Sequence, residues 1–263
     1  MLGRVKLSVV IITFNEEANI GRTLESVRPL VAEGAGEIIV VDSGSTDRTR
    51  AIAESMGAKV FVEPWKGYAA QKSSAIEKAG GEWVLSLDAD ESMEPELAEE
   101  IRATLRTSTE PHGFWIPRKN YFLGRWIRHG GFWPDPKLRL FRRGSGRFED
   151  RPVHETLKVT GATARLRNAL IHRSYPTLTQ YIDHMNRYSS LGAEVAVAGA
   201  HRGFGLWNIV LRPRLTFAYN YFLRLGFLDG REGLLLHLYH ATYVSWKYAK
   251  AWEKSREQAS KSS

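Results

Sequence analysis

The 263-residue sequence contains no cysteine. This absence excludes disulfide bonds, thiolate zinc sites and a cysteine nucleophile. It fits a reducing cytoplasm, which is the compartment we expect for the protein. No run of about 20 apolar residues occurs, so we expect no membrane-spanning helix. The first six residues lead directly into a strand pattern, and we therefore expect no secretory signal.

Two common nucleotide-binding motifs are also missing. No Gly-x-Gly-x-x-Gly follows the first apolar run, and no Gly-Lys-Ser/Thr loop occurs anywhere in the chain. These absences argue against a dinucleotide-dependent enzyme and against a Walker-type nucleotidase.

The charge is divided unevenly along the chain. Residues 1–110 contain 12 Lys and Arg against 19 Asp and Glu, a net charge of −7, whereas residues 111–263 contain 25 against 10, a net charge of +15. Such asymmetry predicts a polyanionic partner for the second half: a membrane surface, a phosphorylated glycan or lipid, or nucleic acid. Because the chain has no recognised nucleic-acid module, we expect no nucleic-acid partner.

Short apolar runs alternate with amphipathic segments over the first 110 residues. We expect strands at 7–12, 37–41, 58–62 and 83–87, and helices at 19–30, 48–56, 68–78 and 95–105. Four such alternations with short connections predict a parallel α/β sheet. Further strands are expected at 113–118, 137–141, 157–159 and 164–172, and from residue 177 the chain is predicted to be helical.

Carboxylates follow two of the expected strands. The run 83–87 ends directly before Asp88 and Asp90, which share one face of an extended chain. Ligands bind at the carboxyl ends of parallel strands, and two carboxylates there predict a divalent cation held with a phosphate. A solvated loop that caps the next helix is the alternative. Asp42 ends another strand and suits either a hydrogen bond to a nucleoside or a turn beside Gly44.

Three motifs together resemble glycosyltransferase family 2. They are Val9–Glu17 (VVIITFNEE), Val40–Asp47 (VVDSGSTD) and Asp88-Ala89-Asp90, in the family's order and spacing. The resemblance covers residues 7–110 and implies an inverting enzyme that uses a nucleotide-sugar donor. It also implies the GT-A fold, an α/β fold with a mostly parallel, Rossmann-like sheet. Looser similarity at Val153-His154-Glu155 and at residues 227–230 points to the branch of bacterial lipopolysaccharide-core β-glucosyltransferases.

The resemblance implies roles for individual residues. The nucleotide sugar would be held by Thr13, Phe14, Asn15, Glu17, Asp42 and Asp88. Lys72 would lie near the donor, although a solvated lysine is an equal alternative. Asp90 would bind Mg²⁺ or Mn²⁺ at the diphosphate. A second metal ligand stays open between His154 and His172, and the family's spacing favours His172.

An inverting transfer requires a general base that deprotonates the acceptor hydroxyl. The candidates outside the nucleotide motifs are Asp135, Glu149, Asp150 and Glu155. We prefer Glu155 because nearby arginines would keep it ionised and because it matches the family's base position. The family often has Glu-Asp at this point, whereas this chain has His-Glu. An ordinary ion pair with an arginine is the alternative role for Glu155.

The loop of residues 121–136 combines aromatic, arginine and glycine residues. Aromatic rings stack on sugars and arginines bind phosphates, so we predict that Trp126, Arg128 and Trp133 contact the acceptor. The glycines would let the loop move as a lid. A hydrophobic flap packed on the sheet is the alternative.

Two segments of the helical region, 206–228 and 234–252, have apolar and aromatic faces edged by Arg and Lys. Such faces suit helices that lie in a membrane interface. Packing against the catalytic domain or against a dimer mate is the alternative, and a homo-oligomer stays open.

These observations predict a catalytic domain at 1–175, with a nucleotide-sugar half at 1–110 and an acceptor half at 111–175. A helical, membrane-associating extension is predicted at 176–263. We expect a hexose, with glucose as the first candidate, to pass from a UDP-sugar to a hydroxyl of a lipopolysaccharide-core or other lipid-linked glycan. The enzyme would work on the inner face of the cell membrane. A polyprenyl-phosphate glycosyltransferase and a non-catalytic scaffold that binds membranes or nucleic acid are the alternatives.

Overall fold

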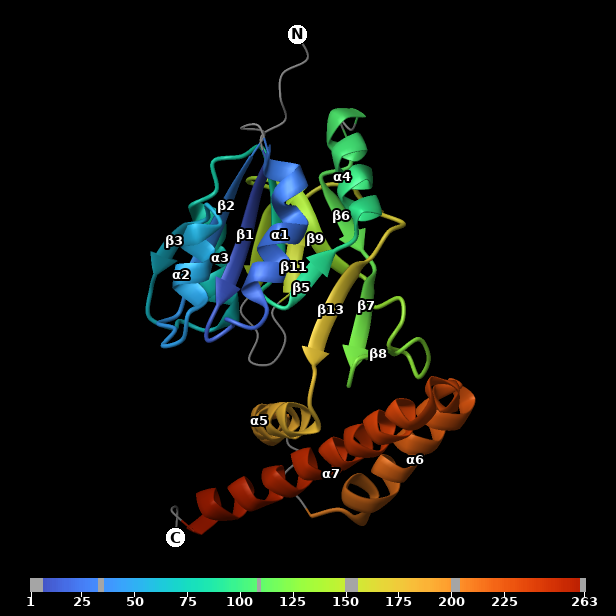
Figure 1. Cartoon of the computed structure of the whole chain (residues 1–263). Helices are drawn as coiled ribbons and strands as arrows, with labels where there is room; N and C mark the ends of the chain where they lie inside the picture. The colour runs from blue at the N-terminus through green and yellow to red at the C-terminus, as the bar shows by residue number, and fades with distance from the viewer. Residues whose placement is uncertain (1–6, 33–35, 108–109, 150–155, 200–203, 261–263) are drawn as a thin grey trace. The chain divides into compact units, whose positions relative to one another are not determined.

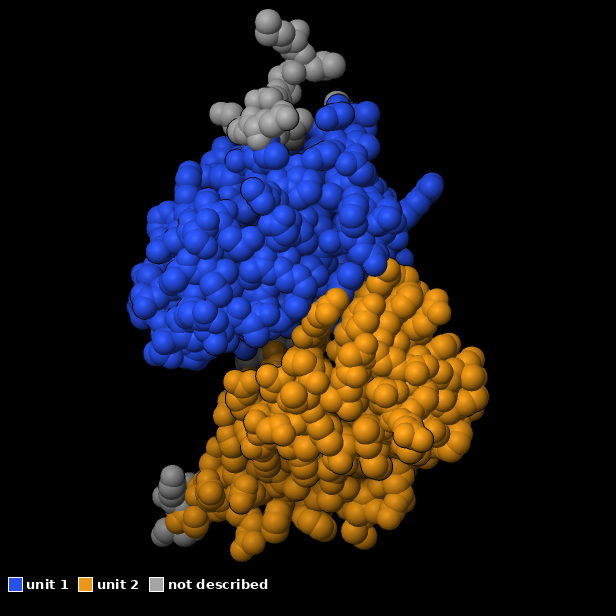
Figure 2. All heavy atoms as spheres, viewed as in Figure 1, with its two compact units in different colours: residues 1–118, 135–172 blue, residues 119–134, 173–263 orange. Residues whose placement is uncertain are grey.

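The computed structural model describes residues 7–32, 36–107, 110–149, 156–199 and 204–260. The chain divides into two compact units (Figure 2). Unit 1 comprises residues 1–118 and 135–172, and unit 2 comprises residues 119–134 and 173–263. This division differs from the predicted domains because residues 119–134 group with the helices. The predicted domain boundary at residue 175 stays a prediction.

Unit 1 is built on a seven-stranded sheet with the order β12-β6-β9-β4-β1-β2-β3 (Figure 1). Four neighbouring strands are parallel: β1 (Leu7–Thr13), β2 (Gly36–Asp42), β3 (Lys59–Val62) and β4 (Trp83–Asp88). The others are β6 (Gly113–Ile116), β9 (Lys137–Arg142) and β12 (Thr163–Arg165), of which β9 runs antiparallel to both β4 and β6. The predicted α/β fold with a mostly parallel sheet is confirmed.

Helices cover both faces of this sheet because successive strand residues point to opposite sides. The helices are α1 (Ile20–Val31), α2 (Thr49–Ser55), α3 (Tyr68–Glu77) and α4 (Pro95–Thr107). Val9 and Ile11 of β1 belong to one apolar cluster with α1, α2 and α4, whereas Val10 belongs to another with Ala75 of α3. The carboxyl ends of β1, β2 and β4 are thereby fixed at one edge.

One expected strand, 164–172, is wrong. The chain instead forms β12 and, after a turn, β13 (Leu170–Tyr175). The carboxylate of Glu100 on α4 accepts hydrogen bonds from the backbone N–H groups of Arg167 and Asn168, at 2.8 and 2.9 Å. These two groups are therefore not available for strand pairing.

Two strand pairs were not predicted in unit 1. β13 runs antiparallel to β5 (Glu91–Met93), which begins directly after Asp90. β10 (Gly146–Glu149) and β11 (Thr156–Val159) form an antiparallel pair on the α3 side.

Unit 2 contains most of β7 (Arg118–Phe122), with β8 (Arg125–Trp126) antiparallel to it. The predicted loop 121–136 therefore begins with a hairpin. The long helices are α5 (Leu178–Ala198) and α7 (Gly230–Ser260), and the short helical segments are η2 (Trp207–Leu211), α6 (Arg212–Ala218), η3 (Tyr219–Leu223) and η4 (Gly226–Asp229).

The helical extension packs around α7, which contacts α5 over one stretch and α6 over another (Figure 1). Phe122, Ile127, Tyr181 and Leu236 form a buried cluster between the hairpin and the helices of unit 2. Within the residues that the structure describes, no helix has the length and hydropathy required to cross a membrane.

Candidate active site

The strand register gathers the predicted residues at one edge of the sheet. Thr13 on β1 lies opposite Asp42 on β2, and Ile12 lies opposite Asp88 on β4. Three neighbouring parallel strands therefore present Thr13, Asp42 and Asp88 at adjacent carboxyl ends, where α/β sheets bind ligands.

Asp42 orders the turn that follows β2. Its buried carboxylate accepts hydrogen bonds from the hydroxyls of Thr13 and Ser45 and from the backbone N–H groups of Gly44 and Ser45. A carboxylate offers about four acceptor positions, so these four hydrogen bonds, three of them from the turn, use all of them. The structure thus supports the turn role, and the nucleoside role stays a prediction.

The loops after β1 and β2 are bound to each other. The backbone N–H of Asn15 donates to Ser45 Oγ at 2.8 Å, and Asn15 Oδ1 accepts from the backbone N–H of Thr46 at 2.9 Å. Glu17 Oε2 accepts from the backbone N–H of Arg48 at 3.1 Å. Phe14, which precedes Asn15 in the chain, is 56% exposed. The paired loops hold the residues predicted to bind the nucleotide sugar in one place. Their contacts with the nucleotide sugar stay predictions.

Asp88 is held between two buried cations. Lys72 Nζ lies 2.8 Å from its Oδ1, and the Arg139 guanidinium pairs with its Oδ2. Burial would raise the pKa of Asp88, but Arg139 and Lys72 hold that pKa well below its usual range. The alternative of a solvated Lys72 is wrong, because its side chain is only 5% exposed.

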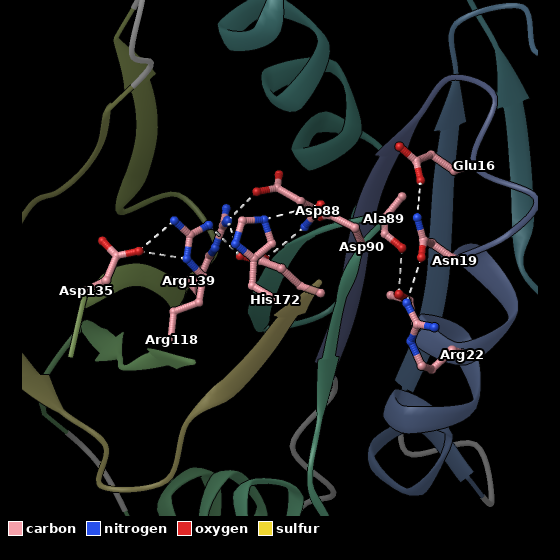
Figure 3. A network of polar contacts seen from close by, with 12 residues as sticks. Glu16, Asn19, Arg22, Asp88, Ala89, Asp90, Arg118, Asp135, Arg139 and His172 are labelled. Carbon is pink, nitrogen blue, oxygen red and sulfur yellow. Dashed lines mark hydrogen bonds and ion pairs between the residues drawn. The ribbon is translucent and has the colours of Figure 1, made fainter. Parts of the chain in front are cut away.

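A chain of alternating charges extends from Asp88 across unit 1 (Figure 3). Arg139 also contacts Glu91 Oε1 at 2.7 Å, and Arg118 contacts the same oxygen at 3.1 Å. Arg118 in turn lies 2.7 Å from Asp135 Oδ2. Glu91 is fully buried, and its Oε2 accepts from the backbone N–H of Asp88 at 3.0 Å. The network therefore fixes both the charge and the position of Asp88.

Asp90 pairs with His172, whose Nε2 lies 3.2 Å from Asp90 Oδ2 (Figure 3). The antiparallel pairing of β13 with β5 brings them together, because His172 lies opposite Glu91 in that register. Burial would raise the pKa of Asp90, yet His172 brings it below the usual value.

An oxygen and an imidazole nitrogen suit Mn²⁺, and a carboxylate suits Mg²⁺. The described residues contain no group of three His, Cys, Asp or Glu side chains arranged to hold a metal ion. The Asp90–His172 pair therefore fits a cation that takes its other ligands from water and a bound diphosphate, as Mg²⁺ commonly does.

Glu16 adds negative charge at this edge and was not predicted as a site residue. Burial raises its pKa; a hydrogen bond from Asn19 Nδ2, at 2.8 Å, lowers it, and the nearby charges of Asp90, Asp47 and Asp88 raise it further. The carboxylates gathered here favour a cation.

The preferred base, Glu155, lies outside the described residues, as do Asp150 and His154. The other two candidates are ion-paired: Asp135 with Arg118 and Lys137, and Glu149 with Lys158. The role of Glu155 stays a prediction.

Unit 2 brings the three predicted acceptor residues together. The ring centroids of Trp126 and Trp133 are 5.2 Å apart, and the Arg128 guanidinium lies 4.4 Å from the centroid of Trp126. Lys119 Nζ lies 5.2 Å from the same centroid. An aromatic pair with two cations around one ring suits a sugar phosphate, and the acceptor role stays a prediction.

Asp229 anchors the loop that carries these residues. It is buried, and its Oδ2 accepts from the backbone N–H of His129 at 2.8 Å. Its Oδ1 accepts from the backbone N–H of Arg128 at 3.2 Å and lies 3.0 Å from His129 Nδ1. The predicted lid is therefore tethered at residues 128–129 by a residue 100 positions away in sequence.

Comparison with known proteins identifies the family. The profile described as glycosyl transferase family 2 matches residues 8–172, which include both acids of the Asp-Ala-Asp motif and His172. The chain belongs to glycosyl transferase family 2.

Relatives of this family 2 member match over nearly its whole length. It is 31% identical over 261 residues to the lipopolysaccharide core biosynthesis glycosyltransferase LpsC of Rhizobium meliloti, covering 97% of this chain and 94% of the relative. It is 33% identical over 243 residues to an uncharacterized glycosyltransferase of Rickettsia felis, covering 88% and 83%.

Among solved structures, the mannosyltransferase PcManGT of Pyrobaculum calidifontis superposes with a TM-score of 0.55 at 18% identity, covering 94% of this chain and 87% of that one. At this identity the similarity shows the fold alone. The predicted family, its GT-A fold and its glycosyltransferase class are confirmed, and the scaffold alternative is set aside.

Arg139, Glu91 and Arg118 of this glycosyltransferase were missed by sequence reasoning. One signal was present for Arg139, which is the only charged residue between Leu138 and Phe141 in an apolar strand. A buried charge needs a partner, so such a residue indicates an internal ion pair.

Proposed function

We propose that this family 2 glycosyltransferase transfers a hexose, with glucose as the first candidate, from a UDP-sugar to a hydroxyl of a lipopolysaccharide-core or other lipid-linked glycan. One observation carries the proposal: Asp42 and Asp88 end the two strands that flank β1, and the Asp90–His172 pair follows Asp88. The Rhizobium relative, which the chain matches over 94% of that protein's length, supports the acceptor class.

Metal dependence is part of the proposal. Asp90 and His172 would hold Mg²⁺ or Mn²⁺, which would neutralise the departing diphosphate. The glucosyl-3-phosphoglycerate synthase of Mycobacterium tuberculosis has been solved with Mn²⁺ and UDP, and superposes with a TM-score of 0.50 at 21% identity, covering 73% of this chain and 77% of that one. PcManGT has been solved with GDP-mannose and Mn²⁺, so GDP-sugars belong in any donor test.

The chain's own residues would divide the remaining work. Asp88, kept ionised by Arg139 and Lys72, would accept hydrogen bonds from ribose hydroxyls. Glu155 would take the proton of the acceptor hydroxyl as its oxygen attacks the anomeric carbon, which inverts that centre. The site would act in the cytoplasm, peripherally on the inner face of the membrane.

A thermal-shift panel tests the donor and the metal. With Mn²⁺, UDP-glucose should raise the Tm more than GDP-mannose, because ligands that bind only the folded state stabilise it. Asp90→Asn should lose the metal-dependent part, whereas Glu99→Gln, a change on the exposed face of α4, should keep it. A larger shift with GDP-mannose, or an equal shift without metal, would contradict the proposal.

The polyprenyl-phosphate alternative needs no base, because its acceptor is already an anion. Glu155→Gln should therefore lower the turnover of a hydroxyl acceptor by about 10²-fold or more. Unchanged turnover, with donor binding intact, would favour the alternative.

A further inference from the structure

An apolar stripe runs along one side of the helical stretch 207–223 in unit 2. We define it by six side chains: Trp207, Leu211, Leu215, Tyr219, Phe222 and Leu223. Each is between 45% and 75% exposed. Their spacing of mostly four residues keeps them on one side of η2, α6 and η3.

The opposite side of this stretch is packed. The backbone carbonyl of Ile209 accepts from Ser245 Oγ at 2.8 Å, Arg212 reaches the hydroxyl of Tyr248, and Pro213 is buried. These contacts attach the stretch to α7 and leave the apolar stripe outward. The second segment predicted to face a membrane, residues 234–252, is less suited to that role. Val244 and Tyr248 of α7 are buried, and the large exposed apolar residues that the structure describes on this helix are Leu234 and Leu238, near its start.

The charged residues within the stretch that carries the apolar stripe are all of one sign. Between Glu194 and Asp229 the sequence has no acidic residue and four arginines. Arg214 is exposed and stands between Leu211 and Leu215 of the stripe, and Arg224 is exposed at its end. An apolar strip flanked by cations matches the headgroup boundary of an anionic bilayer. Trp207 and Tyr219 are residue types that favour this boundary.

A second copy of the chain fits this surface less well. A two-fold dimer would bring the same patch of each copy together and would set arginines against arginines, with no acid of the stripe to neutralise them. Anionic lipid removes that repulsion and buries the same apolar area.

We infer that the apolar stripe is a docking surface for anionic lipid, which seats unit 2 in the interface without crossing the membrane. The inference deepens the proposed location and rests on it. It does not depend on the donor, so lipid binding and donor binding can fail separately.

Flotation of the full chain with vesicles tests it. The protein should float with phosphatidylglycerol–phosphatidylcholine vesicles and much less with phosphatidylcholine alone. The triple change Leu211→Ser, Leu215→Ser and Phe222→Ser should weaken binding by about tenfold or more. Arg214→Glu should weaken it by about fivefold or more and make the remaining binding less sensitive to salt, because fewer cations then face the anionic lipid. Val195→Ser, an equally exposed apolar change on α5, should bind as wild type.

The rise in Tm that UDP with Mn²⁺ causes, measured on every variant, separates this inference from the proposed function. Retained stabilisation with lost flotation supports the docking surface. Equal flotation of wild type, the triple variant and Arg214→Glu overturns it. A wild-type dimer in sedimentation that the triple variant loses, without vesicle binding by either protein, also overturns it and assigns the stripe to a second copy.

Discussion

At the scale of single residues, Arg139 is a buried cation that two carboxylates of the site share. It lies between Asp88 and Glu91, and it is 7% exposed while Glu91 is fully buried. A buried ion pair gains little over apolar packing, yet removal of one member leaves the other charge without water or partner. Its partners in the network thus depend on it.

Arg139→Met should lower the free energy of unfolding by about 3 kcal/mol, because buried Glu91 and half-buried Asp88 lose the cation that they share and keep only Arg118 and Lys72. Urea unfolding at neutral pH measures the change. The control is Arg28→Met, which breaks the exposed pair of Arg28 with Glu25 and should cost about 0–1 kcal/mol. Similar losses for the two variants would contradict the importance of the buried network.

The sequence identified acids of this site but not their partners. Asp88 and Asp90 were predictable because residue type and position at a strand end indicate their role. His172 was placed near them by family spacing, and the reason it arrives there, the pairing of β13 with β5, has no local signal. Long-range ion pairs such as Asp88 with Arg139 depend on tertiary packing, which residue patterns do not encode.

At the scale of elements, Glu63 fastens the end of β3 to α3. It accepts hydrogen bonds from Lys78, Ser74 and Lys66, at 2.5, 2.7 and 3.0 Å. These contacts, that of Lys78 first, lower its pKa to about 2. A carboxyl whose pKa is lower in the folded state stabilises above its unfolded pKa, and this stabilisation disappears as pH falls through the folded value.

Glu63→Gln should therefore be less stable than wild type at neutral pH, and the gap should shrink as pH falls from about 4.5 towards 2. Urea unfolding across this range measures the gap. A gap of constant size would show that Glu63 acts by packing rather than by charge.

The tether between Asp229 and the loop at Arg128 and His129 gives a second prediction at this scale. Asp229→Asn replaces one acceptor oxygen by an amide donor, which leaves a backbone N–H unpaired at a cost of about 1–3 kcal/mol. Hydrogen exchange at residues 128–129 should accelerate. The nearby Glu232→Gln, which removes only a 3.8 Å contact with Arg125, is the control. Equal exchange in both variants would argue against the tether.

The predicted and observed strands and helices show where the local sequence is enough to predict secondary structure. The first four strands and their helices match the predicted ranges within two residues, because their apolar period and turns are strong. The hairpin of β7 and β8 was missed since its turn places Leu123 and Gly124 at φ of 50° and 81°. Leucine at such a φ is uncommon, so the sequence carried only half of the turn signal.

At the scale of the whole molecule, the charge asymmetry corresponds to different surfaces. The acidic first 110 residues contain the sheet edge with Asp42, Asp88 and Asp90, where a cation would be drawn. The basic remainder contains the stretch of 34 residues without an acid that carries the apolar stripe. One chain thereby presents a cation-attracting edge and an anion-attracting face.

Because the acidic sheet edge and the basic helices are distinct parts of the chain, binding of the donor nucleotide should change hydrogen exchange only at the sheet edge. UDP with Mn²⁺ should slow hydrogen exchange at the loops after β1, β2 and β4, near residues 13–17, 42–47 and 88–91, because ligand binding suppresses local opening there. The middle of α7 should be unaffected. Asp90→Asn under the same conditions should show the Mn²⁺-free pattern. Equal slowing in α7 would mean that the donor is bound by the helical unit as well, and that the sheet edge alone does not form the site.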